Sequence, residues 1–180
     1  MITEIHLFDF DGTLFRSPLP PEKWPDGDWW PNPASMKPPY VPHNPGNEWW
    51  ISQPVSAIRA AIGNPAAYTA VITARMYPLR SRITEVLNMG GIRPDDIILN
   101  ESDFGAARYK MQEMKYLTRQ FPTANVLHFW EDNGEHLREF HRYAERRLGK
   151  AFVPHLIRSK RVPASADPSP RRVASRYTDR

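Results

Sequence analysis

Short apolar runs alternate with helical patterns along most of this chain, and this alternation constrains the fold more than any other feature. The runs are rich in strand-forming residues and have the length of buried strands. The apolar runs are residues 4–10, 67–73, 96–100, 125–131 and 151–157, and the helical patterns are residues 54–62, 78–89, 104–120 and 134–148. Strands that alternate with helices indicate a parallel sheet with helices on both faces. We therefore expect an α/β fold, a Rossmann-like three-layer parallel sheet.

Residues 18–54 differ in composition from the rest of the chain. They contain 11 of the 19 prolines and five of the six tryptophans. Proline fixes the backbone and removes a hydrogen-bond donor, so neither a helix nor a central strand is expected there. Five indoles are unusual for a disordered segment, because aromatic side chains normally pack. We expect residues 16–53 to form an ordered, irregular insert that is too short to make an independent cap domain.

The positive charge of the chain is concentrated at its C-terminal end. Residues 158–180 contain seven Lys or Arg and two Asp, a net charge of +5, whereas the whole chain carries +4. Residues 1–157 therefore carry −1 and form the predicted domain. We expect residues 158–180 to be a basic, disordered tail, which is either solvated chain or an arm that binds nucleic acid.

Several classes of protein are excluded by what the sequence lacks. The chain contains no cysteine, which excludes disulfides, thiolate metal sites and a cysteine nucleophile. No apolar run approaches the roughly 20 residues that span a bilayer, and the first residues do not resemble a secretory signal. We expect a cytoplasmic protein that does not contact a membrane.

Polar residues follow the predicted strands where each one ends. In a parallel sheet the carboxyl ends of the strands meet at one edge, where ligands bind. The residues expected there are Asp9, Asp11, Thr73, Arg75, Glu131 and Asp132, together with Lys110 from the helix that follows the third strand. This arrangement predicts one site that contains several carboxylates, a hydroxyl group and basic side chains.

This combination of side chains suits a divalent cation and a phosphate. Asp9 and Asp11 would repel each other without a cation between them, and Asp132 adds a further hard oxygen ligand. Gly12 permits a sharp turn that brings backbone N–H groups toward an anion. With Lys110 to neutralise charge, one aspartate is left to attack phosphorus. A calcium loop is the other interpretation of the aspartate pair, but the positions of its glycine and glutamate do not fit.

Four short motifs resemble those of the haloacid dehalogenase (HAD) superfamily. They are Asp9-x-Asp11-Gly12-Thr13, a strand that ends at Thr73, a helical Lys110, and Glu131-Asp132 at the end of another strand. Residues 7–18 with the Trp-rich stretch after them, residues 71–75, and Glu131-Asp132 with His136 and Phe140 more closely resemble the Swiss Army Knife RNA-repair-like branch. They are also similar to the phosphatase half of polynucleotide kinase-phosphatases. The resemblance extends over about residues 4–145.

The resemblance implies a role for each matched residue. Asp9 corresponds to the nucleophile and Asp11 to the general acid and base. Thr73 corresponds to the phosphate-binding hydroxyl group, and Lys110 to the motif-three lysine. A Mg²⁺ ion would be bound by Asp9, Asp132 and the backbone carbonyl of Asp11.

Other assignments that follow from the resemblance are more open. Gly12, Arg75 and Glu131 are candidates for contacting substrate, although Arg75 could also cap a helix and Glu131 could support the metal ligands. Lys115, on the same predicted helix as Lys110, is the alternative motif-three lysine. The sequence has Ala74 where the branch usually has glycine, and Asn133 where it usually has arginine.

The predicted function is Mg²⁺-dependent hydrolysis of phosphomonoesters through an aspartyl-phosphate, with phosphorylated nucleic-acid ends as substrates. The alternatives are a phosphatase of a small metabolite or nucleotide, and an inactive module that binds nucleic acid or protein. The sequence has neither a phosphate-binding kinase loop nor a ligase motif, so separate kinase or ligase chains are the expected partners. Because the insert is too short to form a closed cap, we expect the cleft to stay open on one side. We therefore also expect that a tryptophan of the pairs Trp29–Trp30 or Trp49–Trp50 is accessible and faces Asp9.

Overall fold

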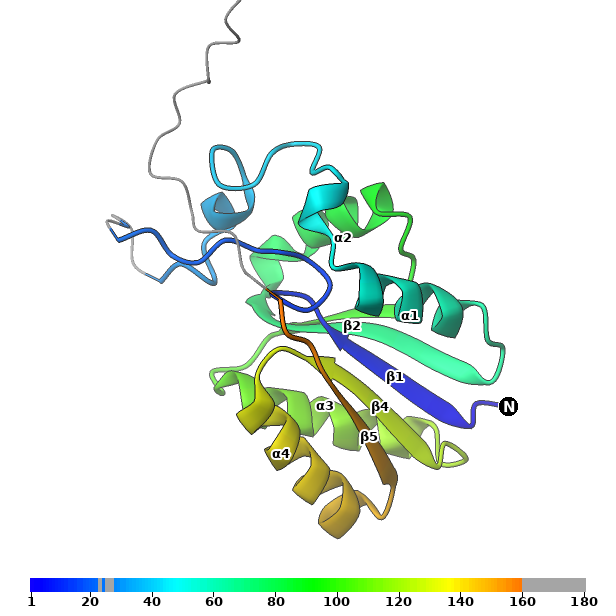
Figure 1. The fold of residues 1–180 in the computed structure, drawn as a ribbon. Coiled ribbons are helices and arrows are strands. Elements are labelled where there is room, and N and C mark those ends of the chain that lie inside the picture. The colour runs from blue at the N-terminus through cyan, green and yellow to red at the C-terminus, as the bar shows by residue number, and fades with distance from the viewer. Residues whose placement is uncertain (23, 25–27, 160–180) are drawn as a thin grey trace, which may run out of the picture.

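A five-stranded, all-parallel sheet forms the centre of the protein, in the strand order β3-β2-β1-β4-β5 (Figure 1). The computed structural model describes residues 1–22, 24 and 28–159. The strands are β1 (Glu4–Asp9), β2 (Ala67–Met76), β3 (Asp96–Asn100), β4 (Val126–Glu131) and β5 (Ala151–Leu156). The α/β fold class and the parallel sheet predicted from the sequence are confirmed.

Helices cover both faces of this sheet and complete the three layers (Figure 1). The helices are α1 (Ser52–Ile62), α2 (Arg80–Met89), α3 (Ala106–Gln120) and α4 (Gly134–Tyr143). Short turns of helix are η1 (Pro33–Met36), η2 (Asn47–Trp49), η3 (Tyr77–Leu79) and η4 (Ala144–Leu148). Among the described residues, no helix combines the length and the hydropathy that crossing a bilayer requires.

Alternating side chains of β1 divide the hydrophobic core into two halves. Ile5 and Leu7 are fully buried with α3 and α4 on one face of the sheet, whereas Phe8 packs with α1 and α2 on the other. Neighbouring strand residues point to opposite faces, and both faces of β1 are apolar near its carboxyl end. The strand is therefore fixed at the centre of the sheet, and its last residue, Asp9, lies in a rigid position.

Several element boundaries differ from those predicted, among them those of β2, α1 and α4. β2 continues past Thr73 to Met76 through a register shift against β3, so Arg75 belongs to the strand instead of following it. α1 begins at Ser52, two residues before Pro54. The N–H groups of the first helical turn have no partner within the helix, so a proline there removes no hydrogen bond. α4 ends at Tyr143 and is followed by a single π-helical turn, η4.

The insert packs on the domain and lies over the carboxyl ends of the strands (Figure 1). Met36 and Val41 are fully buried in the same core half as α1 and α2. Arg82 of α2 donates to the backbone oxygens of Met36, Pro42 and His43 at 3.0, 2.7 and 3.1 Å. The described residues of the insert are irregular apart from the short helices η1 and η2. The predicted tail lies outside the described residues beyond Ser159.

Candidate active site

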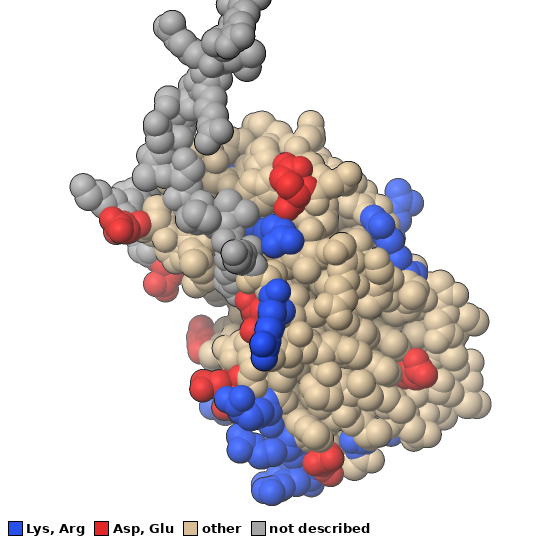
Figure 2. Space-filling view, in the orientation of Figure 1, with Lys and Arg blue, Asp and Glu red and all other residues tan. Residues whose placement is uncertain are grey.

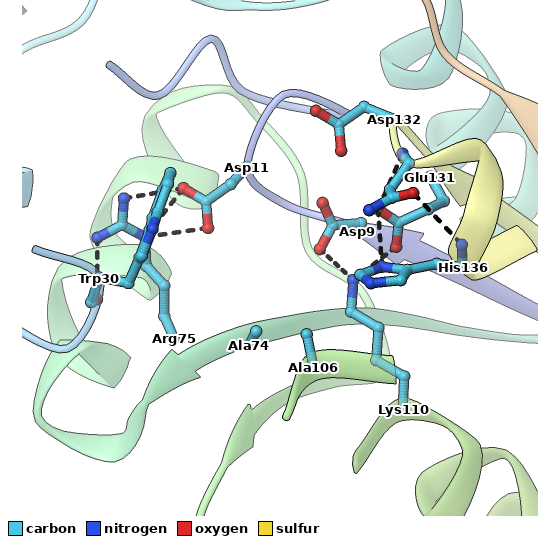
Figure 3. A pocket seen from close by; sticks show the side chains of 11 residues that line it. Asp9, Asp11, Trp30, Ala74, Arg75, Ala106, Lys110, Glu131, Asp132 and His136 are labelled. Atoms are coloured by element: carbon cyan, nitrogen blue, oxygen red, sulfur yellow. Dashed lines mark hydrogen bonds and ion pairs between the residues drawn. The ribbon is translucent and has the colours of Figure 1, made fainter. Parts of the chain in front are cut away.

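A pocket of about 350 Å³ opens at the carboxyl ends of β1, β2 and β4 (Figure 3). It collects side chains from these three strands, from α3 and α4, and from the insert. Its lining consists of Asp9, Asp11, Trp30, Ala74, Arg75, Ala106, Lys110, Glu131, Asp132, Asn133 and His136. Every predicted site residue except Gly12 and Thr73 therefore lines a single pocket.

Lys110 holds two carboxylates together at the floor of this pocket (Figure 3). Its Nζ donates to Asp9 Oδ1 at 2.6 Å and to Glu131 Oε2 at 2.7 Å. All three residues are buried, and only 2% of the surface of Lys110 is exposed. Lys115, the alternative lysine, is exposed on α3. The structure thus brings Lys110, and not Lys115, to the carboxylates.

The acid–base properties of these three groups follow from burial and from their mutual charges. Burial, reinforced by Glu131 and opposed by Lys110, raises the pKa of Asp9 well above its usual range. Burial also opposes ionisation of Glu131, but the Lys110 ammonium and His136 outweigh it and lower its pKa to about 2. Burial alone would lower the pKa of Lys110, yet the two carboxylates raise it. The pocket therefore contains a stable Lys110–Glu131 ion pair. Beside it lies the Asp9 carboxyl group, whose negative charge is poorly compensated when it is ionised.

Asp11 lies on the opposite side of the pocket and is held by Arg75 (Figure 3). The Nε of Arg75 donates to Asp11 Oδ1 at 2.9 Å and to Oδ2 at 3.0 Å, and Thr73 Oγ1 donates to Oδ2 at 3.2 Å. Arg75 is 1% exposed, and its Nη1 donates to Ser35 Oγ of the insert at 2.6 Å. The guanidinium group, predicted as a substrate ligand, thus contacts Asp11 and the insert.

The turn after β1 places Asp9 and Asp11 on these two sides. Gly12 has a φ of 77°, a conformation that favours glycine, and its N–H donates to Phe15 O at 2.7 Å. Its carbonyl oxygen accepts from Ser159 Oγ at 2.7 Å. Thr13 Oγ1 lies 3.4 Å from Asp9 Oδ2. The tight turn separates the two aspartates and fixes the direction of each side chain.

Three carboxylates near the pocket floor have the chemistry of a magnesium site. Asp9, Glu131 and Asp132 each offer an oxygen, and these oxygens lie within 4.8 Å of one another. Hard oxygen donors in such a group suit Mg²⁺. Asp9 and Asp132 of the predicted metal set belong to this group, whereas the side chain of Asp11 is engaged by Arg75. The three carboxylates therefore fit a Mg²⁺ ion. Among them, the ion would best compensate the charge of Asp9.

The insert brings one indole to the pocket. Trp30 lines it together with Asp9, and the Arg75 guanidinium carbon lies 5.2 Å from the centre of the Trp30 ring. Trp29 is 3% exposed, and Trp49 and Trp50 pack against Phe15. Trp30 is thus the tryptophan of the two pairs that shares a pocket with Asp9, and it lies beside Asp11 and Arg75 (Figure 3).

Three residues in or beside the pocket were missed or underrated from the sequence. Ser35 contacts Arg75 from η1, 40 positions earlier in the sequence, and no local pattern signals such a contact. Asn133 accepts from the backbone N–H groups of Glu135 and His136 and so caps α4. The sequence alone indicates a helix cap at Asn133. His136 lies one helical turn later and reaches the pocket, with its Nδ1 at 3.9 Å from Glu131 Oε1.

The sheet, together with a lysine that joins two carboxylates at its carboxyl edge, defines a domain of the HAD type. Residues 11–163 match the family described as HAD domain family 1 in Swiss Army Knife RNA repair proteins, and the chain belongs to that family. The match begins at Asp11, two residues after Asp9.

Two solved structures are similar in fold. A chain of a Pnkp1/Rnl/Hen1 RNA repair complex aligns at 14% identity with a TM-score of 0.52, covering 86% of this chain and 43% of the other. A chain of another Pnkp1/Rnl/Hen1 complex aligns at 13% identity with a TM-score of 0.51, covering 86% and 47%. This chain thus spans less than half the length of the solved chains that it matches. No curated protein gave a significant match to the sequence.

Proposed function

We propose that this protein is a Mg²⁺-dependent phosphatase that hydrolyses phosphomonoesters at nucleic-acid ends through an aspartyl-phosphate. The observation that carries the proposal is the buried group of Asp9, Lys110 and Glu131 beside Asp132, within one pocket. An inactive binding module would have no use for carboxylates packed at this cost in desolvation. Membership of an RNA repair family supports phosphorylated nucleic acid as the substrate class.

The positions of the side chains suggest how they would divide the reaction. Asp9 attacks phosphorus, and the bond from phosphorus to the leaving oxygen breaks while Asp11 supplies a proton to that oxygen. Asp11 then takes a proton from the water that hydrolyses the aspartyl-phosphate, which releases inorganic phosphate and restores Asp9. Mg²⁺ held by Asp9 and Asp132 would neutralise charge on the phosphoryl oxygens. Lys110 offsets the charge of Asp9, and Arg75 keeps Asp11 oriented.

Surface charge offers a second argument for a polyanionic substrate. Lys and Arg side chains gather over the region of α4 and the turn that follows it (Figure 2), where Arg142, Arg146 and Arg147 lie. α4 starts at the pocket, since Asn133 and His136 both line it. A nucleic-acid strand that leaves the pocket along α4 would meet these cations.

A substrate panel tests the proposal. The panel should contain RNA and DNA oligonucleotides with 3′- or 5′-phosphates, free nucleotides and sugar phosphates, each with Mg²⁺ and with a chelator. We expect Mg²⁺-dependent release of phosphate, with at least one oligonucleotide preferred in kcat/KM over the small substrates. A preference for a small phosphate would favour the metabolite alternative, and no release from any substrate would favour the binding module.

Glu131, the last residue of β4, and Asp132, which follows it, are expected to differ in their effect on metal use. Asp132→Ala should raise the Mg²⁺ concentration needed for half-maximal activity more than Glu131→Gln does, because Glu131 is already paired with Lys110. The measurement is a Mg²⁺ titration of initial rates with a small chromogenic phosphate. Equal shifts in the two variants would contradict this division of roles.

Trp30 is expected to distinguish large substrates from small ones. Trp30→Ala should weaken oligonucleotide binding, since stacking of one base is worth about 1–3 kcal/mol, while turnover of a small chromogenic phosphate changes little. Trp30→Phe should keep most of the binding, and Trp24→Ala serves as the control because Trp24 packs on Trp29 and Tyr40. If Trp30→Ala lowers both activities equally, the indole supports the site instead of binding a base.

A further inference from the structure

Three histidines and a glutamate form a cluster on the sheet that the proposed reaction does not use. Glu4 and His6 lie on β1, His128 on β4 and His155 on β5, the three neighbouring strands labelled in Figure 1. His6 pairs in register with His128. All four side chains are partly buried and lie before the strand ends that carry Asp9 and Glu131. The cluster is therefore separate from the pocket, on the same strands.

The potential ligand atoms of this cluster lie close together. His6 Nε2 is 2.9 Å from Glu4 Oε2, and the rings of His6 and His128 stack with centroids 4.3 Å apart. One ligand atom from each of Glu4, His6 and His128 falls within 4.8 Å of the others. His128 Nδ1 faces His155 Nε2 at 3.2 Å. Three strands thus contribute nitrogen and oxygen donors to one place.

Aromatic stacking explains only part of this arrangement. His155 stacks on Trp130 at 3.9 Å, which accounts for its position. Stacking does not require a carboxylate on the ring nitrogen of His6. Among the described residues, moreover, the buried His6 Nδ1 has no hydrogen-bond partner. The carboxylate on His6 and its ring nitrogen without a partner fit a group of metal ligands better than a row of rings that only stack on one another.

The protonation of the imidazoles also suits a metal. Burial, together with the neighbouring His6 and His155, lowers the pKa of His128 to about 4, and burial lowers that of His155 as well. Neutral imidazole is the form that binds a metal, and a ligating histidine usually uses its second ring nitrogen for an orienting hydrogen bond. The contact between His128 Nδ1 and His155 Nε2 would supply that bond.

We propose that Glu4, His6 and His128 bind a divalent transition-metal ion of the zinc class, with His155 orienting His128. Two imidazoles and one carboxylate are a common zinc ligand set, whereas Mg²⁺ prefers the all-oxygen group around Asp9. The rings of His6 and His128 stand nearly parallel, with an interplanar angle of 9°, so binding requires both to tilt toward a common point. The ion would tie β1 to β4 at a second place besides their backbone hydrogen bonds.

The test is a titration of tag-free protein with Zn²⁺ in the presence of excess Mg²⁺, which occupies the carboxylate group of the pocket. Calorimetry should show one Zn²⁺ bound by the wild type, and the ion should raise the melting temperature. His6→Gln and His128→Gln should each weaken this binding at least tenfold. His43→Gln is the matched control, because His43 is exposed in the insert.

Glu4→Gln keeps the aromatic stack and removes only the carboxylate, so it covers the case in which a histidine variant folds poorly. It should also weaken Zn²⁺ binding at least tenfold, with an unchanged circular dichroism spectrum. Wild-type affinity in Glu4→Gln and in a folded His6→Gln or His128→Gln protein would overturn the proposal, as would a wild type that binds no Zn²⁺ in excess Mg²⁺. The readout is independent of phosphatase activity, so failure of one proposal leaves the other in place.

Discussion

Asp9→Asn is expected to lower phosphatase turnover by about 10⁴-fold or more, which at about 1.36 kcal/mol per tenfold corresponds to about 5.5 kcal/mol of transition-state stabilisation. An amide cannot act as the nucleophile that forms the acyl phosphate, although it fills the same space. The measurement is kcat for the best substrate of the panel, with Asp103→Asn as the control because Asp103 is exposed.

The fold should tolerate this substitution. The raised pKa of Asp9 means that the folded protein disfavours its ionised form, so a neutral side chain relieves an unfavourable burial at neutral pH. Lys110 keeps its partner Glu131. We expect a melting temperature no lower than that of the wild type. Retention of a tenth of the wild-type kcat would refute the assignment of Asp9 as the nucleophile, and loss of the fold would contradict the expectation drawn from its raised pKa.

Lys110→Met is expected to impair both activity and folding. It leaves Asp9 and Glu131 buried near each other without their cation, and loss of one partner from a buried ion pair costs about 3–5 kcal/mol. Chemical denaturation should show a loss of this size, and turnover should fall with it. Added Mg²⁺ should recover part of the lost stability, because the ion supplies positive charge to the same carboxylates.

Lys115→Met on the same helix is the matched control for this experiment. Lys115 is exposed, and replacing an exposed lysine usually changes stability by less than about 0.5 kcal/mol. The structure therefore predicts a large effect at Lys110 and a small one at Lys115. The opposite pattern would show that the lysine of the reaction had been assigned to the wrong turn of α3.

The order of the elements and the meeting of Asp9, Lys110 and Glu131 were predictable from the sequence. Buried strands read as continuous apolar runs, and the carboxyl ends of parallel strands converge whatever the details of packing. The partner of Arg75 was not predictable in the same way. It depends on the extension of β2 beyond Thr73 and on the turn at Gly12, both of which are set by tertiary contacts.

The histidine cluster could not be predicted from the sequence either, for a second physical reason. In the sequence, His6 is more than a hundred residues from His128 and His155, and the three histidines lie on three strands. Their meeting requires both the strand order and the residue-by-residue register between β1, β4 and β5. A shift of one residue would turn each imidazole to the opposite face of the sheet. Apolar patterning indicates that such strands exist but leaves their mutual register open.

The contact between Arg75 and Ser35 gives the insert a part in the evolution and engineering of this domain. Arg75 also reaches the carbonyl oxygen of Trp30, with its Nη1 at 3.4 Å. A loop that only covered the pocket could be shortened, or replaced by a loop of different specificity. Here, excision would remove the contacts of a buried guanidinium group with Ser35 and Trp30, and among the described residues its remaining side-chain partner would be Asp11. Any replacement must therefore bring its own hydrogen-bond acceptors for Arg75, so the lining of the pocket and the position of Asp11 would have to change together.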